Sequence, residues 1–149
     1  MLTAHDLSRL SPREVDQVFR SGQVGKIPDG DAQGTAIFRP GSAAEPWLER
    51  LVHGLAWQGK VVNASTHYLK NKVSPLGFQA IKADVYHDKS WFDGEPCIVL
   101  DYSHTSFVAR WVRDEIRRVG PGLYLGLVYL RHTRLLYFTL QFAEPAEAS

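Results

Sequence analysis

Near its C-terminal end the chain reads Leu123-Tyr124-Leu125-Gly126-Leu127-Val128-Tyr129-Leu130, and after a short polar turn comes Leu135-Leu136-Tyr137-Phe138. The side chains of a strand point alternately to its two faces, and these runs are apolar at odd and even positions alike. Both faces of the strands must therefore be covered by protein. An antiparallel sheet of this kind usually curls around a core and carries helices outside, which predicts a closed barrel or a strongly curled sheet.

The middle of the chain predicts further short strands. The stretches Ser74-Pro75-Leu76-Gly77 and Asp93-Gly94 are typical of turns. The spacing between turns favours antiparallel meander connections. Together with the C-terminal runs, we expect strands at 35–39, 60–62, 66–72, 78–87, 96–103, 123–131 and 135–142.

The first helix is predicted by Ser11-Pro12-Arg13-Glu14, in which serine caps the helix, proline suits its first turn and glutamate completes a capping box. Val15, Val18 and Phe19 then share one face, and Gly22 ends the helix. The segment after it, 25–34, contains three glycines and a proline, so we expect turns there.

Two more helices are expected from apolar residues spaced three and four apart. The first covers 47–55, where tryptophan, leucine and valine recur at this spacing. The second covers 105–119, where Val108, Trp111 and Ile116 share one face. Its other face is predicted to lie in solvent and contains Arg110, Arg113, Arg117 and Arg118, with Asp114 and Glu115 between them.

Composition limits the function classes. The chain has 149 residues, 44% hydrophobic residues and a formal charge of +1, so no charge excess draws it to nucleic acid or to an anionic membrane. We expect a single domain over residues 1–149, with 1–10 and 143–149 poorly ordered, in the cytoplasm. Cys97 is the one cysteine and lies in an apolar strand, which predicts a buried thiol.

Several short pieces resemble one known family, the small lipocalin-like barrels of the GXWXG type. They are Pro28-Asp29-Gly30 with Gly34, then Trp57-Gln58-Gly59-Lys60, Gly94 through Asp101-Tyr102, and Gly122 through Gly126. In place of the family's N-terminal Gly-X-Trp-X-Gly signature, the chain has only the spacing from Gly30 to Gly34, without the tryptophan. The resemblance implies an α+β, calycin-like barrel whose interior holds a small apolar molecule, and it implies no particular activity.

Aromatic residues on the expected strands are candidates for the wall of a binding site, because a tyrosine or tryptophan offers apolar area with a polar tip. We therefore predict a protein that binds a small hydrophobic or aromatic molecule. The candidate ligand-binding residues are Tyr68, Tyr86, Trp91, Tyr102, Tyr124 and Tyr129.

An enzyme on the same scaffold, an isomerase, cyclase or hydrolase, is the alternative. Asp101, His104, Tyr86 and His87 would then act as acid and base. For Asp101 a structural role, as acceptor for a neighbouring loop, is the simpler interpretation. The six histidines show no metal-ligand spacing, so we expect neither a metal nor a cofactor.

A third alternative is an interaction domain. Its surface would include Trp91 and Phe92 in the segment 89–94, and a homodimer is one form it would take. The alternative to a solvated arginine face is that one arginine of 110–118 stacks on a tryptophan and closes the barrel, because a planar guanidinium packs well against an indole ring.

Overall fold

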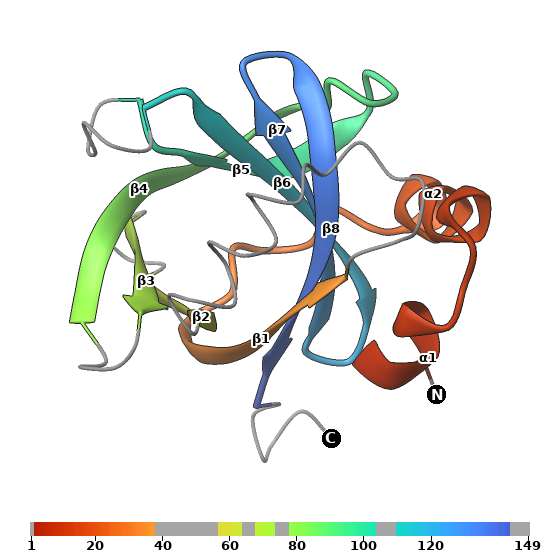
Figure 1. Ribbon diagram of the computed structural model, residues 1–149, viewed down its shortest axis with the longest axis horizontal. Coiled ribbons are helices and arrows are strands. Elements are labelled where there is room, and N and C mark those ends of the chain that lie inside the picture. The colour runs from red at the N-terminus through yellow and green to blue at the C-terminus, as the bar shows by residue number, and fades with distance from the viewer. Residues whose placement is uncertain (1, 38–56, 64–67, 74–77, 104–109, 144–149) are drawn as a thin grey trace.

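The computed structural model describes residues 2–37, 57–63, 68–73, 78–103 and 110–143. Each strand pairs antiparallel with the next, and β8 pairs with β1, so the sheet closes into a barrel (Figure 1). The predicted barrel with short helices is confirmed. The strands are β1 (Gly30–Ile37), β2 (Trp57–Asn63), β3 (Tyr68–Val73), β4 (Phe78–Lys89), β5 (Pro96–Asp101), β6 (Val112–Gly120), β7 (Leu123–Leu130) and β8 (Thr133–Phe142).

Two helices precede the barrel, α1 (Ala4–Ser8) and α2 (Pro12–Ser21). The capping box of α2 forms as predicted: the Glu14 amide donates to Ser11 Oγ at 3.2 Å, and the Ser11 amide donates to Glu14 Oε1 at 3.0 Å. Val15 and Phe19 on its inner face are fully buried, and Gly22 caps its C-terminal end. Residues 4–8, which we expected to be poorly ordered, form α1. The expected helix 47–55 lies outside the described residues.

The barrel wall separates two apolar clusters. The inner cluster lines the barrel interior with alternate residues of the strands, among them Ile98, Leu100, Ile116 and Phe138. The outer cluster joins the helices to the opposite face of β7 and β8. Its members are Leu7, Val15, Phe19, Ile37, Leu123, Leu125, Leu127, Tyr129 and Tyr137. Both faces of β7 are therefore covered, as its unbroken apolar run predicts.

The prediction of a helix over 105–119 is wrong for its second half. Residues 112–120 form β6, which pairs with β5 and β7. Apolar residues three or four apart predict a helix with one buried face. In the structure the four successive residues from Asp114 to Arg117 are all buried. Both faces of this strand carry charged side chains. They are buried because segments distant in the sequence form hydrogen bonds with them.

The start of β1 also differs from expectation. The expected turns of 25–34 end at 29, and the strand begins at Gly30, where φ is +99°. Inside the barrel, β1 contributes the small residue Ala32, which is fully buried between β2 and β8. A glycine-containing segment forms a strand here because its backbone is bonded on both sides.

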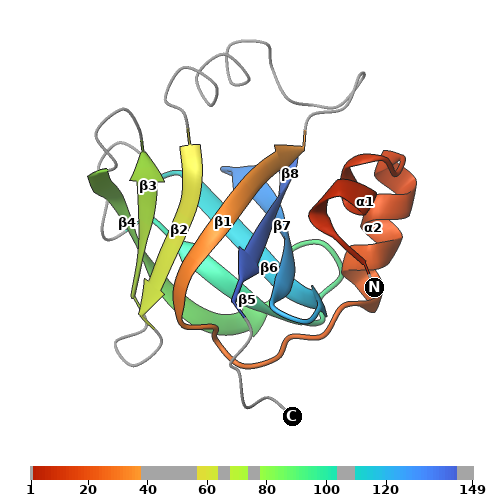
Figure 2. The same cartoon turned by 90° about the horizontal axis from the view of Figure 1, so that it is seen from below.

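One end of the barrel is closed by the chain between α2 and β1, which crosses beneath the strands in Figure 2. Gln23 and Arg118 exchange backbone hydrogen bonds of 2.9 and 2.7 Å, which tie this segment to β6. Val24 and Ile27 pack against the inner cluster. The Tyr124 hydroxyl, from inside, donates to the Lys26 carbonyl at 3.3 Å.

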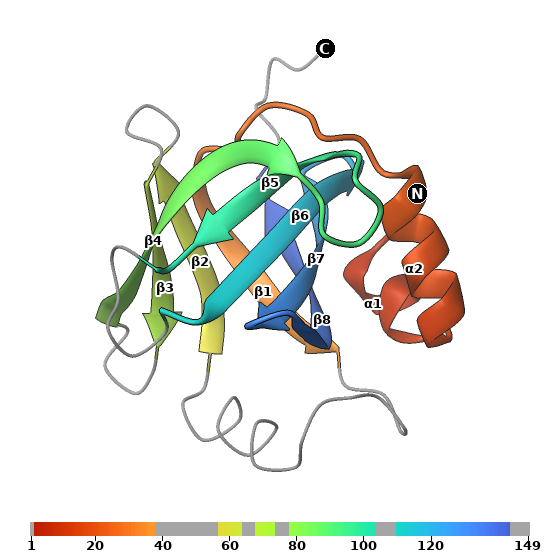
Figure 3. The same ribbon diagram turned by 90° about the horizontal axis from the view of Figure 1, so that it is seen from above.

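The β4–β5 loop folds back over the outer face of β6 and reaches toward α2 (Figure 3). Arg117 holds it there and is only 1% exposed, so the expectation of a solvated arginine face is wrong at this residue. Its five N–H donors reach Asp93 twice, at 2.7 Å each, and the carbonyls of Phe19, Glu95 and Pro96. A buried guanidinium is tolerated here because every donor is bonded and its charge is paired.

The described helices are all too short or too polar to cross a membrane.

Candidate ligand site in the barrel

The candidate site is a ring of inward-facing residues on β4 to β8. The register places Val85, Leu100, Asp114, Val128 and Leu136 opposite one another in succession. Four of the five are apolar, and all four are buried or partly buried. Asp114 is thus a carboxylate set into an apolar wall, with 3% of its surface exposed.

Tyr102 is the polar partner of Asp114 in the interior. Its hydroxyl donates to Asp114 Oδ2 at 3.0 Å, and the side chain is 2% exposed within the inner cluster. The pair lies near the end of the barrel where β5 ends and β6 begins. Tyr102 thus occupies the interior, as the prediction of a wall residue requires.

The location of Asp114 is energetically demanding. Moving a carboxylate from water into an apolar interior costs several kcal/mol unless hydrogen bonds compensate. The pair can accept a hydrogen bond from, or orient, the polar group of a molecule held among the apolar residues.

Tyr124 is the second predicted aromatic that lines the interior. It is 5% exposed and packs edge to face against Phe142, with ring centroids 5.6 Å apart. Because its hydroxyl bonds to the segment that closes the barrel, Tyr124 lies at the closed end. Tyr102 and Tyr124 therefore belong to one interior, at different depths.

Tyr86 and Asp101 lie together on the outside of the barrel wall. On β4 and β5 the residues next to them, Val85 and Leu100, face inward. The Tyr86 hydroxyl donates to Asp101 Oδ2 at 2.7 Å, and burial together with this carboxylate raises the pKa of Tyr86 to about 12. Asp101 also accepts from the Ser103 amide at 2.9 Å and hydroxyl at 2.6 Å, as the simpler structural interpretation expects.

Of the two remaining acid–base candidates, only His87 lies among the described residues, and no contact between it and this pair is seen. His87 is exposed and its Nε2 lies 3.1 Å from the Gly25 carbonyl oxygen. His104 lies outside the described residues. The backbone of Tyr68 lies in β3 opposite Asp84, and its side chain is outside the described part.

Trp91 and Tyr129 pack against each other on the outer surface, with ring centroids 5.3 Å apart. Tyr129 belongs to the outer cluster, and burial raises its pKa to about 12. Arg113 lies over the Trp91 ring at 4.2 Å, so an arginine of this segment does stack on a tryptophan, but on the outer surface and not to close the barrel. These aromatics form part of the outer layer.

Sequence reasoning missed Asp114 as an interior residue because it assigned 105–119 to a helix. The signal that would have found it is the two-residue alternation of Val112, Asp114 and Ile116, which in a strand share one face. Cys97 is fully buried, and burial raises its pKa to about 12, as expected of an inert core thiol. Within the described residues no cluster of three histidine, cysteine or acidic side chains is arranged to hold a metal.

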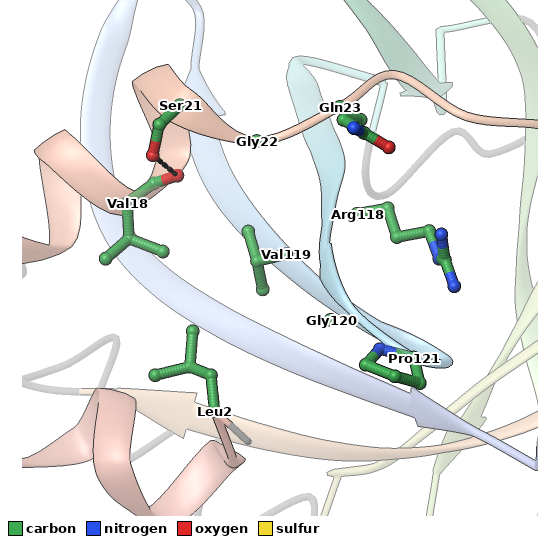
Figure 4. Close-up of a pocket in the computed structure, with 9 residues that line it drawn as sticks. All are labelled: Leu2, Val18, Ser21, Gly22, Gln23, Arg118, Val119, Gly120 and Pro121. Atoms are coloured by element: carbon green, nitrogen blue, oxygen red, sulfur yellow. Dashed lines mark hydrogen bonds between the residues drawn. The ribbon is translucent and has the colours of Figure 1, made fainter.

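A separate groove of about 520 Å³ lies where α2 meets the β6–β7 turn (Figure 4). Arg118 and Gln23 lie on one side of it and Leu2 and Val18 on the other. None of the residues predicted as candidates lines it. The lining residues are Leu2, Val18, Ser21, Gly22, Gln23, Arg118, Val119, Gly120 and Pro121.

Comparison with known proteins supports the fold only. No family model matches the chain, and no curated protein matches it. A solved structure that does match is the crystal structure of a protein from Thermomonospora curvata, with a TM-score of 0.64 and 14% sequence identity. The match covers 91% of this chain and 89% of that one. The similarity therefore shows a shared fold over nearly the whole length of both.

Proposed function

We propose that the barrel binds a small hydrophobic or aromatic molecule in its interior, with Tyr102 and Asp114 engaging its polar group. The observation that carries the proposal is the buried hydrogen bond between these two residues within an otherwise apolar ring. A site made of apolar walls and a few convergent polar groups is the usual design for small-molecule recognition. Residues outside the barrel, including the Tyr86–Asp101 pair, take no part in it.

The chemistry of the pair defines the polar group that suits it. An ionised carboxylate only accepts hydrogen bonds, whereas a tyrosine hydroxyl both donates and accepts. Asp114 therefore favours a ligand that donates, such as an amine or a hydroxyl attached to an apolar body. A hydrogen bond to a charged group inside an apolar site contributes about 1.5–3 kcal/mol, which corresponds to roughly tenfold or more in affinity.

Native mass spectrometry of the purified protein, compared with its denatured mass, is the first test, because a retained ligand appears as added mass. Titration with 1-aminoanthracene, an apolar fluorescent probe with an amine donor, tests the pair directly. We expect Asp114→Asn and Tyr102→Phe to weaken probe binding about tenfold. Tyr129→Phe, an outer-wall tyrosine, is the matched control and should leave the affinity unchanged.

Two results would count against the proposal. One is the absence both of retained mass and of probe binding in the native protein. The other is equal loss of probe affinity in Tyr102→Phe and Tyr129→Phe, which would place the probe outside the barrel. Methylanthracene, which lacks the donor, should bind the native protein and Asp114→Asn alike.

The lipocalin-like kinship and the cytoplasmic location belong to the same proposal. The closed antiparallel barrel with a segment crossing one end supports the kinship. The single, deeply buried cysteine is compatible with a reducing compartment.

A further inference from the structure

Two tryptophans are the large hydrophobic side chains that stay exposed in the described part of the chain. Trp91 is 44% exposed and Trp111 is 48% exposed. The β7–β8 turn connects them: the Arg131 guanidinium lies 4.6 Å over the Trp111 ring, and the His132 ring stacks on Trp91 at 4.4 Å. We call Trp91, Arg110, Trp111, Arg131 and His132 the tryptophan surface.

The backbone of Arg131 has a positive φ angle, which residues other than glycine rarely adopt. It is the one non-glycine residue with positive φ in the described part of the chain, at +61°. It occupies the first position of a two-residue turn between Leu130 and Thr133, where glycine is favoured because a Cβ atom is crowded there. Glycine at this position would relieve the strain, and strained backbone of this kind is often found at functional sites.

The side chain of Arg131 is exposed and rests on Trp111, and within the described residues no carboxylate pairs with it. Arg110 lies over the same indole at 5.0 Å. Stacking on the ring fixes the plane of the Arg131 guanidinium, and because this side chain is exposed, its N–H groups can meet a carboxylate in the fork geometry that suits it. The surface therefore presents oriented donors beside apolar indole edges.

We propose that the tryptophan surface is a docking site for an acidic polypeptide segment in which carboxylates alternate with apolar side chains. The carboxylates would pair with Arg131, and the apolar side chains would lie against the exposed indoles of Trp111 and Trp91. This interaction is independent of the ligand site inside the barrel, because these residues lie on the outer surface.

The same observations favour a polypeptide over nucleic acid. Bases bind by stacking on open aromatic faces, but Arg110 and Arg131 already lie over Trp111, and Arg113 and His132 contact the ring of Trp91. The formal charge of +1 also provides no long-range attraction for a polyanion. Recognition must then come from local pairing with a few carboxylates.

Fluorescence anisotropy with a labelled peptide of repeated Glu-Leu-Glu units tests the proposal at low ionic strength, with Gln-Leu-Gln units as the uncharged control. We expect the acidic peptide to bind and the control to bind at least about tenfold more weakly, because carboxylate pairing is lost. Added salt should weaken the acidic peptide only.

The informative variant is Arg131→Gly, which removes the guanidinium and relieves the backbone strain. We expect peptide affinity to fall about tenfold while the melting temperature is unchanged or higher. A loss of binding in a protein of undiminished stability cannot be ascribed to misfolding. Arg13→Ala, an exposed arginine on α2, is the control and should bind as the native protein does.

Four outcomes would overturn the assignment. The acidic peptide fails to bind the native protein, or it binds Arg131→Gly with undiminished affinity. A single-stranded oligonucleotide binds more tightly than the peptide and depends on Arg131. The native protein self-associates at this surface, so that Arg131→Gly converts a dimer to a monomer.

Discussion

Asp114 and Glu115 are neighbours on β6, and both carboxylates are buried, but they face opposite sides of the barrel wall. Glu115, on the outside, accepts from the Ser90 hydroxyl at 2.5 Å, the Trp91 amide at 2.7 Å and the Arg113 guanidinium at 3.0 Å. Asp114, on the inside, accepts from the neutral Tyr102 hydroxyl among apolar neighbours. The outer carboxylate links the β4–β5 loop to β6, whereas the inner one faces the barrel interior.

Around β6 the outer face is held by charged cross-links, whereas the inner cluster consists of apolar and aromatic side chains. Arg117 and Arg113 fix the β4–β5 loop against β6 from outside. Inside, Gly126 leaves room for the Phe138 ring, since a Cβ at position 126 would lie 2.2 Å from Phe138 Cζ. Substitutions on the two faces should therefore have different consequences, which can be measured separately.

The largest effect is expected from Arg117→Met. It leaves the Asp93 carboxylate and three backbone carbonyls without their donor, so we expect a loss of about 3–5 kcal/mol in the free energy of unfolding. Urea denaturation followed by tryptophan fluorescence measures it. Arg13→Met, at an exposed arginine, is the control. If Arg117→Met lowers the free energy of unfolding no more than Arg13→Met does, the outer cross-links contribute little to stability. Combining Arg117→Met with Asp93→Leu should cost less than the sum of the single variants.

Gly126→Ala should destabilise the protein by about 1–3 kcal/mol, because the added methyl group forces the Phe138 ring to move. The smaller side chain of Phe138→Leu should restore part of the loss when the two changes are combined. Thermal unfolding of the single and double variants measures the coupling. If Gly126→Ala is as stable as the native protein, the interior is looser than its contacts indicate.

The comparison of the two carboxylates predicts opposite profiles for two conservative changes. Glu115→Gln removes the charge paired with Arg113, so we expect a loss of about 1–3 kcal/mol in stability and unchanged affinity for 1-aminoanthracene. Asp114→Asn should weaken probe binding as described above. Fluorescence titration and urea denaturation of both variants give the four values needed. A fall in probe affinity in Glu115→Gln would remove the distinction between the faces.

The smallest effect is expected at alkaline pH. The pKa of Tyr86 is raised from 10.0 to about 12, so folding favours its protonated form. The resulting stability is fully present below pH 10 and is lost as the pH rises toward 12. Tyr86→Phe should therefore lose less stability than the native protein over this range. Urea denaturation between pH 9 and 12 tests this, and parallel curves for the two proteins would contradict it.

The regular parts of the fold were predictable from local signals. The apolar runs of β7 and β8 predict strands covered on both faces, and the capping box at Ser11 and Glu14 predicts the start of α2. In each case the residues that determine the structure are close together in the sequence. The same is true of Cys97, whose apolar neighbours predict its burial.

β6 was not predictable in this way. Its charged residues are buried because Lys89 at the end of β4 and Ser90 and Asp93 in the β4–β5 loop reach them from more than twenty positions away in the sequence. A local pattern of arginines and acids is typical of a solvated helix face, and only the tertiary contacts reverse that interpretation. The error extended to the candidate site, because Asp114 was assigned to the wrong kind of element.

The pairing of β1 with β8 has a consequence for how the protein is made. Ala32 pairs with Phe142, and Ile37 with Tyr137, so one seam joins the first strand to the last. Because a ribosome releases the N-terminal end of the chain first, β1 cannot find this partner until all the strands between them have been made. The edges of β1 and of the growing sheet remain open meanwhile, and pairing across such a sequence distance is slow. Newly made chains should therefore be most prone to aggregate just before β8 emerges.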